Sequence, residues 1–126
     1  MPTILIVDDH ALVRSAVRDL FESRFTTAIQ CAEAENGADA VVKAEELKPD
    51  LIVLDVSMPV MNGFEAAKIL HEMLPAVPLF LLTAHYMEAT VQAALQIGIR
   101  AVFSKYQDLA PLVTHARAVF GAASSL

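Results

Sequence analysis

The sequence contains few of the residues that would indicate secretion, a metal–thiolate site or a membrane span. Its one cysteine, Cys31, cannot form an internal disulfide and has no cysteine or histidine partner at zinc-binding spacing. No apolar run reaches the ~18 uninterrupted residues that a membrane span needs, and Met1 and Pro2 lead straight into a strand pattern instead of a signal region. We therefore expect a cytoplasmic protein that does not span a membrane.

Positive charge is also scarce. The chain has 9 Lys and Arg residues against 15 Asp and Glu, so its formal net charge is −6. Because neutralisation of phosphates by basic side chains supplies most non-specific affinity for DNA, we expect no direct nucleic-acid binding by this domain. The glycine patterns G-x-G-x-x-G and G-x-x-x-x-G-K do not occur, which removes the usual sequence signs of nucleotide binding.

The size and composition of the chain fit one globular domain, residues 1–126. A single core usually takes ~100–150 residues, and an apolar fraction of 56% with 19% charged residues excludes a disordered chain. Residues 122–126 fit either a frayed terminus or the start of a linker.

Short apolar runs alternate with segments of helical periodicity along the whole chain. The predicted strands cover residues 3–7, 28–34, 51–54, 79–82 and 101–103. The predicted helices cover about residues 12–21, 40–47, 64–73, 88–97 and 109–120, with Gly98 and Gly121 ending the last two and Asp108 as an N-cap. Strands that are apolar on both faces belong to parallel sheets covered by helices on both sides. We predict an α/β fold with a doubly wound, five-stranded parallel sheet in flavodoxin-like order 2-1-3-4-5.

Charged or hydroxyl groups stand where four of the predicted strands end. Asp8 and Asp9 follow the first strand, Asp55 ends the third, Thr83 follows the fourth and Lys105 follows the fifth. In this topology ligands bind beside the carboxyl ends of the first and third strands, and carboxylates gathered there favour a divalent cation and then a phosphoryl group. The residues alone leave simpler roles open: helix capping for the paired acids, a turn hydrogen bond for the threonine, a solvated charge for the lysine.

Together these positions resemble the active-site pattern of the receiver domain of two-component response regulators, which have a CheY-like fold. The resemblance covers the whole chain, through Asp8-Asp9, Asp55-x-x-Met58-Pro59-x-x-Asn62-Gly63, Thr83-Ala84 and Lys105. The segment from Ile6 to Arg14 (IVDDHALVR) further resembles the subfamily whose members usually end in a LuxR/NarL-type helix-turn-helix domain.

The resemblance implies a signalling switch that catalyses only its own phosphorylation and dephosphorylation. Asp55 would be the phosphoacceptor for a histidine kinase or a phosphotransfer protein, with Thr83 and Lys105 assisting. The implied cofactor is Mg²⁺, held by Asp8, Asp9, Asp55 and the backbone carbonyl of Ser57. The implied phosphate-binding residues are Ser57, Thr83, Ala84 and Lys105. The resemblance also allows a homodimer through the face formed by helix 88–97, strand 101–103 and helix 109–120.

One departure from the family pattern concerns signalling. Val102 stands where the family commonly has a tyrosine or phenylalanine ring that turns inward, and the neighbouring Phe103 is predicted to point to the opposite face of its strand. Tyr86 and Tyr106 are the rings closest to this face in sequence. A phosphorylation-independent interaction module of the same fold therefore stays open as the alternative function. An aspartyl-phosphate hydrolase is disfavoured, because Ser57 stands where such an enzyme has a second acid.

Overall fold

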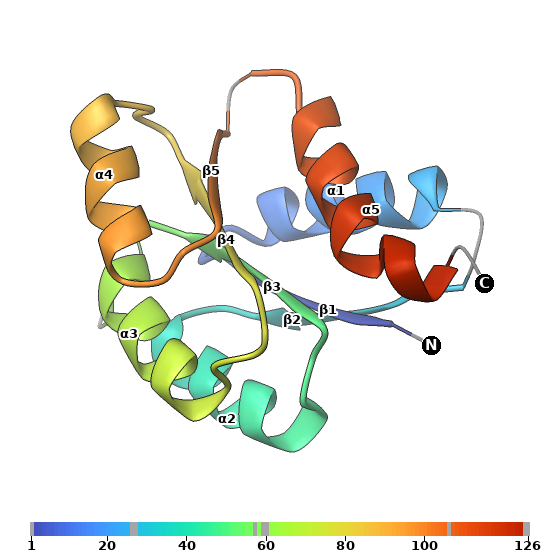
Figure 1. Ribbon diagram of the computed structural model, residues 1–126, viewed down its shortest axis with the longest axis horizontal. Coiled ribbons are helices and arrows are strands. Elements are labelled where there is room, and N and C mark those ends of the chain that lie inside the picture. Colours follow the sequence, from blue (N-terminus) through green and yellow to red (C-terminus); the bar gives the residue numbers. More distant parts are fainter. Residues whose placement is uncertain (1, 26–27, 57, 59–60, 106, 125–126) are drawn as a thin grey trace.

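The computed structural model describes residues 2–25, 28–56, 58, 61–105 and 107–124, with the backbone alone at 121–124. In these ranges five strands alternate with five helices (Figure 1). The strands are β1 (Thr3–Val7), β2 (Gln30–Ala34), β3 (Leu51–Asp55), β4 (Leu79–Thr83) and β5 (Ala101–Ser104). The helices are α1 (Ala11–Arg24), α2 (Gly37–Leu47), α3 (Gly63–Met73), α4 (Glu88–Gln96) and α5 (Ala110–Ser124).

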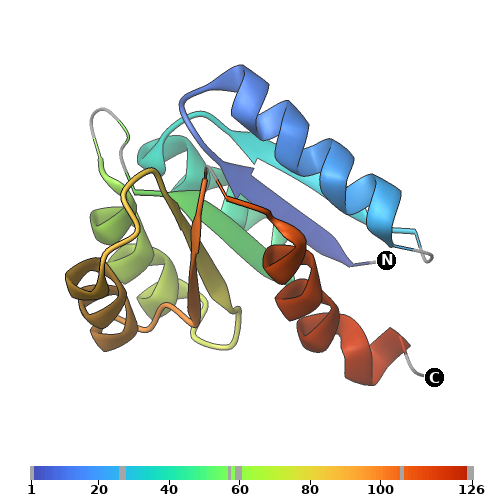
Figure 2. The ribbon, with the colours of Figure 1, turned by 90° about the horizontal axis from the view of Figure 1, so that it is seen from above.

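The strands form one parallel sheet in the order β2-β1-β3-β4-β5, which confirms the predicted fold class and topology. The register pairs Val7 with Leu54, Asp55 with Leu82 and Thr83 with Ser104, so the carboxyl ends of four strands lie beside one another. The loops that follow these strands gather at the end of the sheet opposite the two chain termini (Figure 2).

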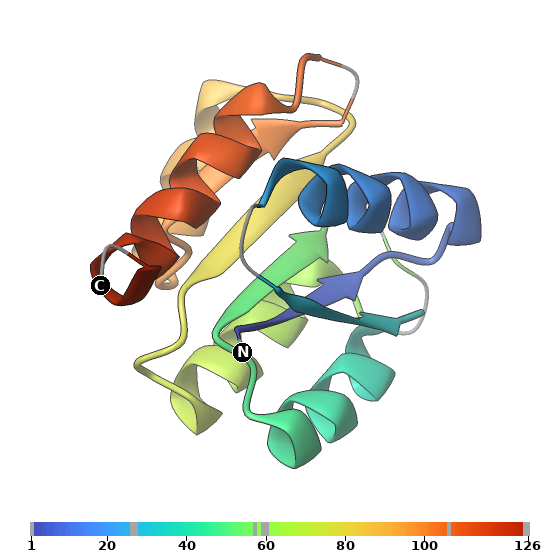
Figure 3. The ribbon, with the colours of Figure 1, turned by 90° about the vertical axis from the view of Figure 1, so that its right-hand side faces the viewer.

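Helices cover both faces of the sheet. Helices α1 and α5 lie on one face, and α2, α3 and α4 lie on the other (Figures 1 and 3). Along β1 the buried side chains alternate between the two cores, with Leu5 packed on the α2–α4 side and Ile4 on the side of α1 and α5. The apolar character of the strands thus follows from burial on both faces, as predicted.

Several helix ends follow the expected local chemistry. The side chains of Asn36 and Asn62 accept hydrogen bonds from the backbone N–H three residues on, at 2.8 and 3.0 Å, and so begin α2 and α3. Asp108 accepts from the N–H of Ala110 at 3.0 Å before α5. Gly98 has a φ of +97°, which confirms it as the glycine that ends α4.

Several predicted boundaries are wrong. Strand β2 begins at Gln30 and not at residue 28, and α2 begins at Gly37 and not at residue 40. Helix α1 continues beyond residue 21 to Arg24, and α5 continues through Gly121 to Ser124. A glycine inside a helix costs about 1 kcal/mol relative to alanine, but here the neighbours 122 and 123 are alanines, the best helix formers. None of the helices in the described ranges has both the length and the apolar character required to cross a membrane.

Candidate functional site

Three charged side chains meet at the carboxyl edge of the sheet. The Nζ of Lys105 lies 2.8 Å from Oδ2 of Asp8 and 3.0 Å from Oδ1 of Asp55. The two aspartates are only 1% and 2% exposed, and the lysine side chain is 10% exposed. One ammonium therefore bridges two buried carboxylates that come from different strands.

This bridge relieves the repulsion that the sequence predicts between the acids. Burial lowers the pKa of Lys105, but hydrogen bonds to Asp8 and Asp55 and the attraction of both negative charges outweigh burial and raise that pKa above its ordinary value. The ammonium is therefore fully charged at neutral pH. Lys105 is thus a counter-charge that allows these carboxylates to lie together.

The backbone around Asp55 is tightly constrained by its neighbours. The N–H of Val56 bonds the carbonyl of Leu82 at 3.0 Å, and the N–H of Gly63 bonds the carbonyl of Val56 at 2.8 Å. A Cβ atom at Gly63 would clash with the carbonyl oxygen of Asp55. Glycine is thus required at position 63 because the start of α3 packs directly against the backbone of Asp55.

Asp9 and His10 complete an acidic cluster on the solvent side. The Nδ1 of His10 lies 3.1 Å from Oδ1 of Asp9 and 3.3 Å from Oδ1 of Asp8. Ligand atoms of Asp8, Asp9, His10 and Asp55 all lie within 4.8 Å of one another. Carboxylate oxygens are the ligands that Mg²⁺ uses in proteins, so the three aspartates of this set fit the ion.

Helix capping does not explain the paired acids. The N-cap of α1 is His10, whose side chain makes no capping hydrogen bond. Oδ1 of Asp8 accepts from the N–H of His10 itself at 2.9 Å, and among the described residues neither Asp8 nor Asp9 bonds an N–H within the first turn of α1. Asp8 pairs with Lys105 instead, and ligand atoms of both acids lie within 4.8 Å of one from Asp55.

Thr83 is buried at the end of β4, and its hydroxyl is engaged in a local turn. It donates to the carbonyl of His85 at 3.2 Å and accepts from the N–H of the same residue at 3.1 Å. This is the turn hydrogen bond that the sequence left open as the simpler role. The half-buried Ala84 follows in the same turn. The hydroxyl must leave this turn before it can bind a ligand at the cluster.

Three residues of the predicted pattern lie outside the described residues. They are Ser57, which the sequence suggested as a metal and phosphate ligand, together with Pro59 and Tyr106.

Sequence reasoning did not identify the role of Arg14, which it quoted only within a family segment. The guanidinium of Arg14 donates from Nη1 to the backbone carbonyl of Asp8 at 2.7 Å. Its position six residues after Asp8, in the first turn of the helix, was the available signal, but the direction of the side chain requires the structure.

The outer edge of β5 carries a pocket of about 330 Å³. Val102 packs toward the α2–α4 core and Phe103 toward the α1 and α5 core, so the predicted opposite orientation is confirmed. The ring of Phe103 contacts His115 at a centroid distance of 5.1 Å. The lining residues are Tyr86, Ala101, Val102, Phe103, Ser104, Gln107, Asp108, Pro111 and His115.

Comparisons with known proteins agree with this geometry. Residues 4–117 match the family described as the response regulator receiver domain. The chain is similar to the transcriptional regulatory protein LnrK of Bacillus subtilis, with 38% identity over 98 residues, 78% of this chain and 44% of that protein. It is also similar to the chemotaxis protein CheY of Thermotoga maritima, with 36% identity over 98 residues, 77% of this chain and 79% of that protein.

A solved structure shows the same likeness in three dimensions. A two-component response regulator of the LuxR family from Aurantimonas sp. SI85-9A1 matches with a TM-score of 0.86 and 30% identity, over 95% of this chain and 85% of that chain. The chain spans about half the length of the transcriptional regulators from Bacillus and Pseudomonas aeruginosa that it matches, 44% and 56%.

Proposed function

We propose, from the premise that this chain belongs to the response regulator receiver domain family, that Asp55 accepts a phosphoryl group and that the domain then switches a protein-interaction surface. The family places the chain in two-component signalling. The donor in this proposal is a histidine kinase or a phosphotransfer protein. The observation that carries the proposal is the bridge from Lys105 to the buried carboxylates of Asp8 and Asp55.

The residues at the cluster suit phosphoryl transfer. A carboxylate is anionic at neutral pH and attacks phosphorus without a separate base, so an oxygen of Asp55 would form the new O–P bond while the P–N bond to the donor histidine breaks. Asp8, Asp9 and Asp55 would hold Mg²⁺, with the Ser57 carbonyl as a further ligand. When bound, the ion would neutralise charge on the transferred oxygens, which is the main contribution available in a loose transition state.

Lys105 and Thr83 change partners in this mechanism. The ammonium gives up one carboxylate and pairs with a phosphoryl oxygen, a charge-assisted contact of similar geometry. The Thr83 hydroxyl leaves the carbonyl of His85 and donates to another phosphoryl oxygen. Ser57 and Ala84 would bind the group through their backbone.

We further propose that residues 1–126 act as one cytoplasmic receiver unit. Its partner surface would be the face formed by α4, β5 and α5, either in a homodimer or against another protein. In this proposal the domain contacts neither nucleic acid nor membrane.

Intact-mass measurement after treatment with acetyl phosphate or phosphoramidate tests the proposal. We expect one added phosphoryl group in the presence of Mg²⁺, and none after Asp55→Asn or in EDTA. Asp19→Asn, at an exposed position on α1, is the matched control and should be labelled like the wild type. An unchanged wild-type mass under all conditions would favour the phosphorylation-independent interaction module.

A further inference from the structure

We infer that Arg14 is a positioning residue for the metal-binding loop: its guanidinium holds the Asp8–Asp9 peptide in the arrangement that Mg²⁺ needs. The inference deepens the proposed function, because the ion is the one proposed for the acidic cluster. It concerns a side chain outside the ligand set proposed for the ion and the phosphoryl group.

The contacts of Arg14 place it behind the acidic loop. Its side chain is 17% exposed, and two of its donor nitrogens face different partners. Nη1 donates to the carbonyl of Asp8 at 2.7 Å, and Nε donates to Oε1 of Glu33 at 3.0 Å. A charged donor on a backbone carbonyl makes a stronger hydrogen bond than a neutral one.

The carbonyl of Asp8 is the point where such a contact matters. It belongs to the peptide unit that joins Asp8 to Asp9, so rotation of this unit would redirect the Asp9 carboxylate. The N–H of Asp8 is already held by the carbonyl of Ala34 at 3.1 Å. The hydrogen bond from Arg14 therefore fixes the other side of Asp8, just before the exposed Asp9, whose carboxylate pairs with His10.

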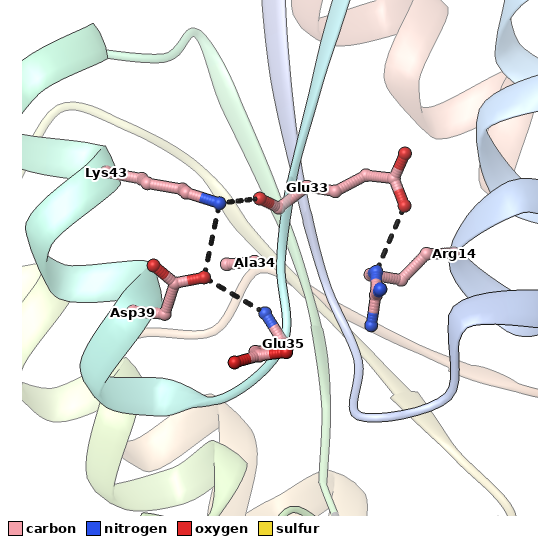
Figure 4. Close-up of a pocket in the computed structure, with 6 residues that line it drawn as sticks. All are labelled: Arg14, Glu33, Ala34, Glu35, Asp39 and Lys43. Carbon is pink, nitrogen blue, oxygen red and sulfur yellow. Dashed lines mark hydrogen bonds and ion pairs between the residues drawn. The ribbon is translucent and has the colours of Figure 1, made fainter.

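The guanidinium is itself anchored on β2 through Glu33, whose carboxylate is shared between Arg14 and Arg18. Figure 4 shows the pair with Arg14 and the backbone carbonyl of Glu33, which accepts from Lys43 of α2. Lys43 also pairs with Asp39 at 3.2 Å. Arg14, Glu33, Asp39 and Lys43 are among the residues that line a pocket of about 340 Å³. The ion pair with Glu33 and the hydrogen bond to Asp8 hold the planar fork of Arg14 in one orientation.

Positioning and simple electrostatics predict opposite results. Arg14 is a cation near a cation site, so its Coulomb effect alone disfavours Mg²⁺, and its removal would tighten binding. Loss of a positioning contact loosens binding instead. Residues that orient metal ligands typically contribute 10–100-fold in metal affinity. Arg14 contacts only the backbone of a ligand residue, so we expect an effect near the lower end of this range, about 10-fold.

A Mg²⁺ titration of the wild type and three variants tests the inference. The amide NMR signals of Asp8 and Asp9 report the binding and give the Kd. We expect Arg14→Gln to raise the Kd about 10-fold. Arg14→Lys keeps the positive charge, but its single ammonium lacks the rigid fork that reaches both Glu33 and the Asp8 carbonyl. Its Kd should therefore lie between those of the wild type and Arg14→Gln. Arg18→Gln is the matched control, because Arg18 pairs with the same Glu33 and donates to the carbonyl of Cys31 instead of Asp8. Its Kd should stay within about twofold of the wild type, well below the change that loss of an orienting contact causes.

A second measurement separates positioning from general destabilisation. At saturating Mg²⁺, Arg14→Gln should reach the wild-type extent of phosphorylation by acetyl phosphate, while the Mg²⁺ concentration for half-maximal labelling rises in step with Kd. The melting temperatures of Arg14→Gln and Arg18→Gln should fall by similar amounts relative to the wild type, since each variant loses an ion pair with Glu33. If Arg14→Gln fails to fold, the Kd of Arg14→Lys relative to Arg18→Gln decides the question.

The inference is wrong if Arg14→Gln binds Mg²⁺ as tightly as the wild type or more tightly, or if Arg18→Gln weakens binding equally. It is also wrong if the wild type shows no saturable Mg²⁺ binding at Asp8 and Asp9. A wild type that binds Mg²⁺ but gains no phosphoryl group contradicts the proposed function alone, and the Kd values still decide the role of Arg14.

Discussion

The carboxyl ends of β1 and β3 and the outer edge of β5 differ in how firmly their side chains are held. At the first region, Asp8 and Asp55 are buried and share the ammonium of Lys105 at 2.8 and 3.0 Å. At the second, Val102 is half-buried, Tyr86 is 53% exposed, and a pocket of about 330 Å³ lies between them and α5. The difference indicates that ion pairs hold the side chains at the carboxyl ends of β1 and β3, the chemical region, in fixed positions. The outer edge of β5, the surface region, has room for side chains to rearrange.

The two regions meet at the ends of β4 and β5. Thr83 pairs in register with Ser104, and the N–H of Lys105 bonds the carbonyl of Thr83 at 2.9 Å. A change of partner by either functional side chain would therefore act directly on the loop that leads to Tyr86 and α4. A pre-existing two-state element is enough for a switch when a ligand favours one state by a few kcal/mol.

The largest expected effect is that of Lys105→Met on stability. Removal of the shared cation leaves two carboxylates buried beside each other, which costs roughly 3–5 kcal/mol in the free energy of unfolding at pH 7. The pKa of Lys105 is raised in the folded state, so its contribution is fully present below the ordinary lysine pKa and is lost as the pH rises through the folded pKa. Urea unfolding at pH 7 and at pH 11 should show a smaller difference between variant and wild type at the higher pH. Lys68→Met, at an exposed position on α3, is the control. A cost below 1 kcal/mol would mean that the two regions are equally loosely held.

Thr83→Ala tests the junction between the regions. The variant loses a buried hydroxyl that both donates to and accepts from His85, so we expect a loss of about 1–2 kcal/mol in the free energy of unfolding. It should also reduce the amide shifts that beryllofluoride, a phosphoryl mimic, causes in α4. Thr114→Ala removes a hydrogen bond from an exposed hydroxyl to the carbonyl of Ala110 within α5. It should change neither the free energy of unfolding nor the beryllofluoride shifts. Full-sized shifts in Thr83→Ala would show that the threonine does not connect the regions.

Val102→Tyr probes the surface region directly. A larger side chain at the pocket should alter stability by less than about 1 kcal/mol, because the position is half-buried and has adjacent space. In the wild type we expect beryllofluoride shifts that extend from Thr83 through residues 86–97, and Val102→Tyr should change their size without creating them. Wild-type shifts confined to residues at the phosphoryl site would mean that the surface does not respond.

Asp9→Asn should have the smallest effect on stability. The side chain is 28% exposed and its ion pair is with the exposed His10, so the free energy of unfolding should change by less than about 0.5 kcal/mol in EDTA. Mg²⁺ binding should nevertheless be lost, since a proposed ligand of the ion is removed. Thermal melts and a Mg²⁺ titration measure the two outcomes. A marked fall in melting temperature would show that Asp9 supports the fold of the loop and not only the ion.

Much of the fold was accessible from the sequence because its signals are local. The unbroken apolar run of β3 requires burial on both faces, and Asp108, the predicted N-cap, bonds the N–H of Ala110. The end of α5 was not accessible in the same way. Glycine is typical of a helix end, but the two alanines that follow Gly121 favour continuation of the helix. The helix propensities of glycine and alanine differ by only about 1 kcal/mol.

The candidate site shows the same division. Asp8, Asp9, Asp55 and Lys105 follow from sequence position, because parallel strands bring their carboxyl ends to one edge whatever the details of packing. The partners of each side chain do not follow from position. Thr83 bonds its own turn and the lysine bridges two acids.

The sequence by itself determined the order of strands and helices, the two-sided burial of the sheet and the identity of the charged residues at its edge. Periodicity, caps and strand-end positions depend on neighbouring residues in the chain, so the local sequence is enough to predict them. Only the tertiary structure decided that Lys105 bridges Asp8 and Asp55, that Arg14 holds the Asp8 carbonyl and that α3 packs against the backbone of Asp55 at Gly63. These contacts join residues of different strands and helices, and side-chain direction and desolvation, which decide them, are set only when those elements pack together.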